Sequence, residues 1–472
     1  MNINNLIPFK MKTTLKFIFL TILVIGISSC KKEDAKLPFN QLSEEDNKQL
    51  VEDSAIKAAK AFDQMKDEPA VEGSVSMIYH MDMASPMDKK SVEIDKAIST
   101  LKAVAAMNGD DGDINDLLSA IRDPKELSDD PESIQEAWDM LVGTYTWNSS
   151  MDDWDYTENP NEIVFIFPST ENGTSNNATF TVSNYTGVMI SNPLEDDYSG
   201  DLPASLNMEL VIDGETAMTY VFAAEYNSDG IPTSLASDLT MGTFVLSADM
   251  TNNDTEVSAN YKFTNDGETV MEISGALEGD FSDENIQNNT VTYTETYEWT
   301  DYIYNENTQM YEEVIVTEVD EWEEVDIEEI IQSGHFKFRL YDISIGGTGD
   351  IKALVDTMDL IYPEDYYDDP NYDDKTAAQQ EAAALNNNLH IYAIDEASRK
   401  KIADVEAYVV EENYGDGYYS YWVDFRLVFG DGSLVDLETY FEQGFEDFVA
   451  EINSMIRDLN GQYDLDLDQI DY

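Results

Sequence analysis

Cysteine is nearly absent from this sequence: Cys30 is the only one among 472 residues. A lone cysteine allows no internal disulfide and no thiolate-based metal site, and it leaves no cysteine nucleophile in the body of the chain. Stability must therefore come from packing. The length provides enough residues for one large domain, or for two to three ordinary ones, each with its own hydrophobic core.

Positive charge is also scarce. The chain has 26 Lys and Arg against 97 Asp and Glu, which gives a formal net charge of -71. Such a field repels the phosphate backbone, so nucleic acid is excluded as a partner. It also repels an anionic membrane surface. The acidity is typical of a protein kept soluble in a salty exterior, and the alternative is attraction of divalent cations or of a basic partner.

Histidine is rare, and motifs of catalytic sites are missing. The three histidines, His80, His335 and His390, lie far apart in sequence and form no metal-ligand pattern. The last two stand in strand-like runs, where we expect half-buried structural histidines. No serine stands in a nucleophile elbow, and no glycine-rich loop fits a phosphate. We therefore predict no catalytic residue and no metal ligand, although composition alone neither supports nor excludes a carboxylate pair for glycoside hydrolysis.

The long apolar run of the chain lies near its N-terminus. Three lysines between positions 10 and 16 precede an uncharged run at 17–27, and Ser28 and Ser29 then lead to Cys30. The run is too short to span a bilayer as a mature helix, and its flanks are those of a secretory signal. We predict a signal peptide at 1–29.

The tetrapeptide Ile27-Ser28-Ser29-Cys30 resembles the lipobox of bacterial lipoproteins. In that family signal peptidase II cuts before the cysteine, whose thiol and new amino group carry acyl chains. The resemblance covers about the first 35 residues. It implies lipid attachment at Cys30, a tether at 30–42 and membrane contact through the acyl chains, of which two or more anchor stably. The alternatives are a transmembrane anchor, or a cleaved signal with a chance cysteine.

The residues after the cysteine, Lys31-Lys32-Glu33-Asp34, resemble the short Lys-plus-acid export tag of surface lipoproteins in the Bacteroidota. That resemblance implies an outer-membrane protein exposed at the cell surface. Without the tag, the implied location is the periplasmic face of the outer membrane.

Helical periodicity dominates residues 43–142. Ser43 with Asp46 can cap a helix whose apolar residues repeat up to Met65. Further helices are predicted at 91–108 and 113–121. A last one starts at Asp130-Pro131, where Pro suits the first helical position, and ends at Gly143.

From residue 143 to 350 the apolar period changes from about 3.6 to 2. Asp213-Gly214 and Asp266-Gly267 separate alternating runs and predict hairpin turns. Strands with one apolar and one polar face are typical of an antiparallel meander that is wetted on one side. Gly346-Gly347-Thr348-Gly349 is predicted to be a turn or a bulge.

Residues 288–329 depart from this pattern, because they are rich in Tyr, Trp, Glu, Thr and Val. We predict a long acidic hairpin that extends past the sheet and turns near 305–307. Its aromatic residues can stack on sugars or form cross-strand pairs that stabilise the hairpin. They are Tyr293, Tyr297, Trp299, Tyr302, Tyr304, Tyr311 and Trp322.

Residues 351–472 are predicted to form a smaller α+β portion. It has a helix at 377–385, strands at about 389–394, 402–411 and 418–429, and a terminal helix whose apolar stripe should bury against the meander. The fold class is α+β: an antiparallel β-meander in a large curved sheet, with N-terminal helices and a C-terminal helix packed on it. The stripe consists of Phe441, Phe445, Phe448, Ile452, Met455 and Leu459.

Two kinds of metal site are candidates. Met77, His80, Met81, Met83 and Met87 are soft ligands suited to Cu(I), but methionine also fills irregular cores, and we favour packing. Two acidic loops are oxygen-rich enough for Ca²⁺, although neither fits the EF-hand pattern. They contain Asp110, Asp111, Asp113, Asn115 and Asp116, and Asp365, Asp368, Asp369, Asp373 and Asp374.

A strong anchor without a catalytic constellation favours a lipid-anchored protein with a non-catalytic binding or assembly role, toward a protein or glycan partner. One alternative is a carrier of a hydrophobic ligand, because a curved sheet holding helices is similar to the architecture of periplasmic lipoprotein carriers. The other is a secreted hydrolase, which would need a polar cleft with two carboxylates of unlike environment.

Overall fold

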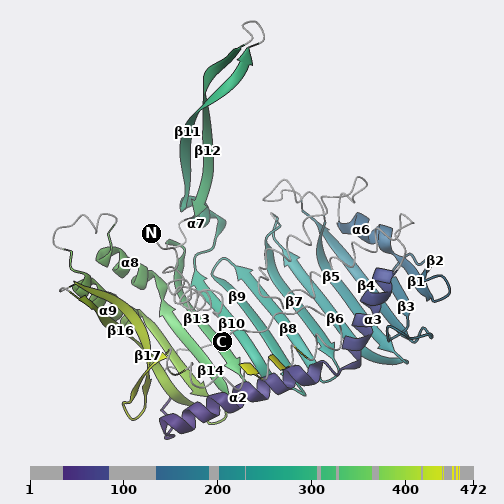
Figure 1. Ribbon diagram of the computed structural model, residues 1–472, viewed down its shortest axis with the longest axis horizontal. Helices are drawn as coiled ribbons and strands as arrows, with labels where there is room; N and C mark the ends of the chain where they lie inside the picture. Colours follow the sequence, from purple (N-terminus) through teal and green to yellow (C-terminus); the bar gives the residue numbers. More distant parts are fainter. Residues whose placement is uncertain are drawn as a thin grey trace.

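Sixteen strands join in one open sheet (Figure 1). The computed structural model describes residues 36–83, 134–190, 201–228, 230–305, 310–325, 329–363, 372–415 and 418–437, with residue 440 and a few residues between 449 and 457. In chain order the strands of the sheet are β1 (Gly143–Asn148), β2 (Asp153–Thr157), β3 (Ile163–Phe167), β4 (Ala178–Met189), β5 (Asp201–Ile212), β6 (Glu215–Tyr226), β7 (Pro232–Met241), β8 (Phe244–Asn253), β9 (Glu256–Asn265), β10 (Glu268–Gly279), β13 (Ile331–Leu340), β14 (Ile343–Asp350), β15 (Leu389–Asp395), β16 (Lys400–Gly415), β17 (Tyr418–Phe429) and β18 (Leu434–Asp436).

The sheet is a meander over most of its width. Its order is β18-β17-β16-β15-β14-β13-β10-β9-β8-β7-β6-β5-β4-β3-β1-β2. Neighbours are antiparallel except β1 and β3, which are parallel. The predicted large antiparallel sheet with helices is confirmed. The strands of the tail, β15 to β18, belong to this same sheet.

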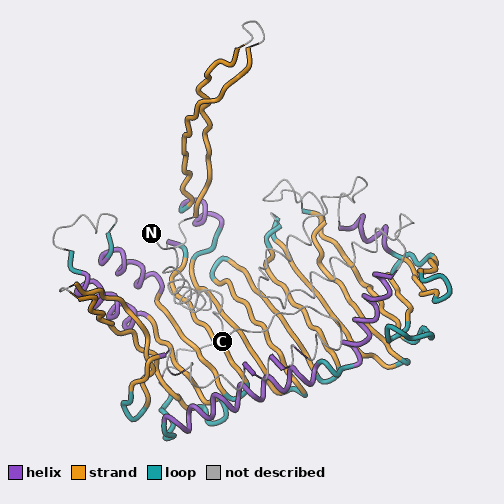
Figure 2. The backbone as a smooth tube through the Cα atoms, viewed as in Figure 1, coloured by secondary structure: helices purple, strands orange, loops and turns teal. Residues whose placement is uncertain are grey.

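Helices occupy the ends and sides of the sheet (Figure 2). α8 and α9 pack on each other, and they contact β13 and the strands β15 to β17. The described helices are α2 (Glu44–Met65), α3 (Pro69–Met83), α6 (Ile134–Leu141), α7 (Asp283–Asn288), α8 (Ile351–Ile361) and α9 (Asp374–Asn388).

One face of the sheet is apolar because alternate residues of each strand point to the same side. The register shows this as a cross-strand row through β5 to β9, formed by Met208, Tyr220, Leu239, Leu246 and Phe263. The sequence predicted this alternation. A single shift of register would turn a strand's whole apolar set to the other face. Of this row only Phe263 is buried, and Leu246 is 44% exposed.

Two of the hairpins turn at the predicted dipeptides. Asp213 and Gly214 have φ of 53° and 85°, and Asp266 and Gly267 have φ of 50° and 78°. Two successive residues with positive φ make the type I′ turn, whose twist matches that of the strands it joins. Asp and Gly tolerate this conformation, which explains why the sequence signal is reliable here.

The helix α2 begins as predicted. The Ser43 hydroxyl accepts a hydrogen bond from the Asp46 backbone N–H at 3.1 Å, and the Asp46 carboxylate accepts one from the Ser43 N–H at 3.4 Å. This capping box satisfies two donors that a helix start otherwise leaves open. Figure 1 shows α2 running across the ends of several strands. There its alanines pack against Phe244, Phe263 and Val270.

At the other end of the sheet, α3 and α6 cover a core built on β1, β3, β4 and β5. α6 confirms the predicted helix up to Leu141, and Gly143 already starts β1. The helix at Pro69–Met83 was not predicted as a separate element. The core contains Met77, Met81, Tyr145, Trp147, Ile163, Phe165, Phe167, Ala178, Phe180 and Leu210.

The glycine-rich run at 346–349 is not the predicted turn or bulge. It lies inside β14 with regular pairing on both sides. A Cβ at Gly347 would collide with the ring of Phe336 on β13. Glycine is therefore needed here for close packing on the sheet face and not for a turn.

A separate two-stranded ribbon leaves the sheet between β10 and β13. β11 (Thr290–Asn305) and β12 (Met310–Val325) pair without a register shift from Thr290↔Val325 to Asn305↔Met310. β10 and β13 still pair directly, so the ribbon is an excursion from an intact ladder. We call it the arm. It confirms the predicted hairpin, and Figure 1 shows it standing clear of the sheet.

Several predictions lie outside the described residues. They are the helices at 91–108 and 113–121 and most of the terminal helix at 441–459. Several described elements had no counterpart in the prediction: α3, β2, β4, β7, α7, α8 and β18. The predicted helix at 377–385 is confirmed within the longer α9, and the three predicted tail strands are confirmed as β15, β16 and β17.

Candidate functional site

The described chain enters the fold on β16. Phe39 forms a parallel bridge with Lys401: the Asn40 N–H donates to the Lys401 carbonyl at 2.8 Å, and the Lys401 N–H donates to the Pro38 carbonyl at 3.0 Å. The Lys401 Nζ lies 4.5 Å from the centroid of the Phe39 ring, and Gly430 leaves room for this side chain. The segment before α2 is thus attached to the sheet.

This attachment and the arm lie at opposite ends of the strands. One cross-strand row joins Lys401, Ile394, Ser344, Arg339 and Glu272 across β16, β15, β14, β13 and β10. β10 then continues to Gly279, about 24 Å further at a rise of about 3.4 Å per residue, before the chain departs into the arm. By the same rise each strand of the arm is about 50 Å long.

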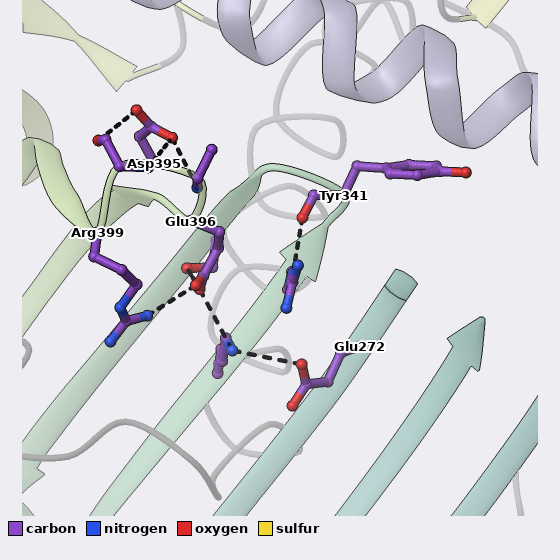
Figure 3. A network of polar contacts seen from close by, with 10 residues as sticks. Glu272, Tyr341, Asp395, Glu396 and Arg399 are labelled. Atoms are coloured by element: carbon purple, nitrogen blue, oxygen red, sulfur yellow. Dashed lines mark hydrogen bonds and ion pairs between the residues drawn. The ribbon is translucent and has the colours of Figure 1, made fainter. Parts of the chain in front are cut away.

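A polar network crosses the sheet face along this row (Figure 3). The Lys337 Nζ lies 3.4 Å from the Glu272 carboxylate and 3.4 Å from that of Glu396. The Ser344 hydroxyl donates to Glu396 at 2.6 Å, and Arg399 donates to it at 2.8 Å. The three strands β10, β13 and β14 and the turn after β15 are thereby joined.

Glu396 is charged in this network although its side chain is only 8% exposed. Burial acts to raise the pKa of Glu396, but the hydrogen bond from Ser344 and the charges of Lys337 and Arg399 together lower it below the ordinary value. A buried carboxylate held ionised by two cations is a stabilising ion network. It offers no proton at neutral pH, so it lacks the acid that paired-carboxylate hydrolysis requires.

The neighbouring Asp395 has a structural role. Its carboxylate accepts hydrogen bonds from the backbone N–H groups of Ala397 and Ser398 at 3.0 and 3.1 Å, and from the Ser398 hydroxyl at 2.6 Å. It therefore closes the turn between β15 and β16. This turn presents Glu396 to Lys337.

His80 lies in the core and not in a metal site. It is 2% exposed, its Nδ1 lies 2.7 Å from the Ser76 carbonyl, and its ring meets that of Trp147 edge-on at 4.7 Å. Burial lowers the pKa of His80. Met77 and Met81 are buried in the same cluster, which confirms packing for these two residues, whereas Met87 lies outside the described residues.

The other two histidines are brought into one cross-strand row. His335 and His390 each pair with Thr348, on opposite sides of β14. Two strand spacings separate them by about 10 Å, which is too far for one metal ion. His335 is half-buried as predicted, and burial lowers its pKa. The prediction is wrong for His390, which is exposed.

A small hollow of about 20 Å³, room for little more than one water molecule, lies where glycines open the apolar face beside α8. Its size is below the usual range for small-molecule pockets, so it does not accommodate an acyl chain. Its lining consists of Gly334, His335, Phe336, Gly347, Thr348, Gly349, Ile351, Leu389 and Ile391.

Of the acidic loops, only the end of the second belongs to the described chain. The Asp373 carboxylate accepts from the Thr376 N–H at 3.0 Å and from the Thr376 hydroxyl at 2.5 Å, so it caps α9. Asp374 is the first residue of that helix. In the part of the chain that the structure describes, no group of three or more His, Cys, Asp or Glu is placed to hold a metal ion.

The predicted lipid site, Cys30, lies outside the described residues, as do the loop at 110–116 and residues 365, 368 and 369. Among the helices described, none is both long and apolar enough to cross a membrane. Lys337 and Glu396 were not singled out from the sequence. The sequence offered one signal for this network: Lys337 is a cation inside an apolar strand, in a chain that has few cations.

Comparison with protein-family models, with curated proteins and with solved structures finds no significant match.

Proposed function

We propose that this protein is a lipoprotein of the outer membrane, anchored through acyl chains on Cys30 and displayed at the cell surface, where it acts by binding or assembly. The binding role is supported by the positions of the two chain segments relative to the sheet. The chain enters the sheet at Lys401, at one end of the strands, and the arm leaves from the other end of β10. An anchor at Cys30 therefore places the arm on the side away from the membrane.

The anchor follows from the order of segments. Phe39, where the chain joins the sheet, is nine positions after Cys30, so the tether spans at most about 30 Å. The strand ends near Lys401 then lie close to the bilayer. The arm, about 50 Å long, extends beyond the far ends of the strands.

A binding role agrees better than catalysis with the described side chains. The buried carboxylate Glu396 is ionised and engaged by Lys337 and Arg399, and the buried His80 is packed against Trp147. Neither group has the arrangement of a nucleophile and its base. The hollow beside α8 does not favour ligand carriage.

Two measurements test the proposal. Radiolabelled palmitate should be incorporated into the parent chain and not into Cys30→Ala, which should be released from the membrane fraction. For orientation, a dye is attached at Asn305→Cys on the arm or at Lys400→Cys near the tether. Energy transfer to an acceptor in the membrane should be strong from position 400 and weak from position 305. Equal labelling of Cys30→Ala, or equal transfer from the two positions, would contradict the proposal.

A further inference from the structure

An apolar strip crosses the sheet between α2 and α8. On one side it is bordered by Met271 and Leu340, which pack in the core under α2. On the other side it is bordered by the hollow beside α8, whose lining includes Phe336 and Gly347. The strip is a single cross-strand row that runs from β17 to β9. Its members are Phe429, Ala403, Ala393, Ile345, Phe338, Ile273 and Tyr261.

The described helices leave the middle of this strip open. Ile345, Phe338 and Ile273 are only partly buried, and Tyr261 is 40% exposed. Within the part of the chain that the structure describes, Phe338 and Ile273 belong to no core cluster. A continuous row of aromatic and branched side chains ordinarily packs against another layer. The strip therefore needs an occupant.

The chain reaches one end of the strip at Tyr440. This residue is 4% exposed, and its ring centroid lies 5.9 Å from that of Phe429, the first member of the strip. It also packs in one cluster with Leu50 and Val51 of α2. We call residues 441–459 the C-terminal segment. This segment thus starts beside α2 and at the head of the strip.

The length of the C-terminal segment matches the length of the strip. Six strand spacings separate Phe429 on β17 from Tyr261 on β9, which is about 29 Å at about 4.8 Å per strand. As a helix, the 19 residues of the segment span about 28 Å at a rise of about 1.5 Å per residue. A helix that starts after Tyr440 and follows the strip therefore ends over β9.

The described residues of the segment show which side of it faces solvent. Five residues between 449 and 457 have helical backbone; Ala450 and Arg457 are exposed, and the other three are partly buried. At about 100° per residue, the apolar stripe from Phe441 to Leu459 lies on the side of the helix opposite to Ala450 and Arg457. In Figure 1 the described residues of the segment, in yellow, follow the line of α2. The stripe therefore points to the surface on which the segment packs.

We infer that the C-terminal segment docks as a helix along the apolar strip, with its stripe on Ile345, Phe338 and Ile273. Docking covers two apolar surfaces at once, whereas an acyl chain on the strip would leave the stripe of the segment uncovered. A second copy of the chain is disfavoured by the net charge of -71, because two copies repel each other. The inference is independent of the anchor at Cys30 and of the arm. It makes the strip part of the core of this chain and not the binding surface of a carrier.

The experiment tests the contact by cross-linking in the otherwise intact chain. A Cys30→Ala background makes the introduced residues the only thiols. The first variant pairs Ile452→Cys with Phe338→Cys. Ile452 is about 18 Å along the helix from Tyr440, and Phe338 on β13 is about 19 Å along the strip from Phe429, so the two positions should face each other.

A second variant pairs Leu459→Cys with Tyr261→Cys, at the far end of the strip. The matched control pairs Ala450→Cys, on the exposed side of the helix, with Phe338→Cys. A short bis-maleimide is added to each, and mass spectrometry of tryptic peptides identifies the linked residues. We expect both facing pairs to link within one chain about tenfold faster than the control, or more, because docking raises their effective concentration.

A control pair that links as fast as the facing pairs would overturn the inference, because the segment would then have no fixed side. Absence of a link in both facing pairs would also overturn it. Links between two chains, seen as a doubled mass, would make a second copy the occupant. Acyl chains that copurify with the parent and are released by organic solvent would make a lipid the occupant. Tyr261→Cys is at an exposed site, so its pair still decides the question if Phe338→Cys fails to fold.

Discussion

The ammonium group of Lys337 on β13 lies 3.4 Å from the carboxylate of Glu396, a residue 59 positions later that the turn after β15 brings to it. The same ammonium lies 3.4 Å from Glu272 on β10. Through Lys337 the network joins Glu272 and Glu396, which are more than a hundred residues apart in the sequence. The arm departs between two of these strands, about 24 Å along β10 from the network.

The first prediction concerns Glu396. Glu396→Gln should lower the free energy of unfolding by about 1–3 kcal/mol at pH 7, because it leaves Lys337 without one of its charged partners. The pKa of Glu396 in the folded protein lies below the ordinary value of 4.5. The ionised carboxylate therefore contributes its full stabilisation above pH 4.5, and this stabilisation is lost as pH falls through the folded pKa. The difference between parent and variant should therefore shrink below about pH 4.5, as measured by urea unfolding. Glu406→Gln is the control, because its pair with Arg426 is more exposed and should cost about 1 kcal/mol or less.

The second prediction concerns the buried His80. Its folded pKa lies below 6.5, so the unfolded chain takes up a proton first as pH falls. The parent should lose stability as pH falls below 6.5, at up to about 1.4 kcal/mol per pH unit. His80→Leu should reduce that slope and leave the part due to His335, whose pKa burial also lowers, whereas His390→Gln, at an exposed site, should retain it. An unchanged slope in His80→Leu would show that another group titrates there.

A third prediction tests the close packing of Gly347. Gly347→Ala should destabilise the fold by about 1–3 kcal/mol, because the added methyl group collides with Phe336. Combining it with Phe336→Leu should recover part of the loss, since the smaller side chain makes room. Thermal unfolding of the two single variants and the double variant gives the coupling. Strict additivity of the two losses would contradict the contact.

The fourth prediction concerns the entry of the chain. Phe39→Ala should release residues 36–42 from β16 and expose them to proteolysis, while the sheet stays folded. Gly430→Ala should give the same phenotype from the opposite side, because its Cβ would occupy the space of the Phe39 side chain. Mass spectrometry of early tryptic fragments locates the cut. Cleavage that is equally slow in both variants would show that Phe39 does not hold the segment.

The sequence predicted those elements whose signals are local. Ser43 and Asp46 specify a helix start through their own hydrogen bonds, and Asp213-Gly214 specifies a turn through the backbone angles it tolerates. Gly347 was misread because its reason is a contact with Phe336 on the neighbouring strand. His390 was misread because it shares the cross-strand row of the half-buried His335, and alternation alone does not say which members of a row are covered. Burial at such positions depends on which other elements pack over the strand, and the periodicity of the sequence gives no information about them.

By itself the sequence determined the antiparallel meander, the long acidic hairpin and the absence of disulfides, because each follows from local period, turn chemistry or composition. Only the tertiary structure decided which distant groups meet. It joined Lys337 with Glu272 and Glu396 and packed His80 on Trp147. It also set Phe39 at one end of the strands and the arm at the other. The physical reason is that strand order and cross-strand register, which select these neighbours, depend on pairing and packing across the whole sheet and not on any single strand.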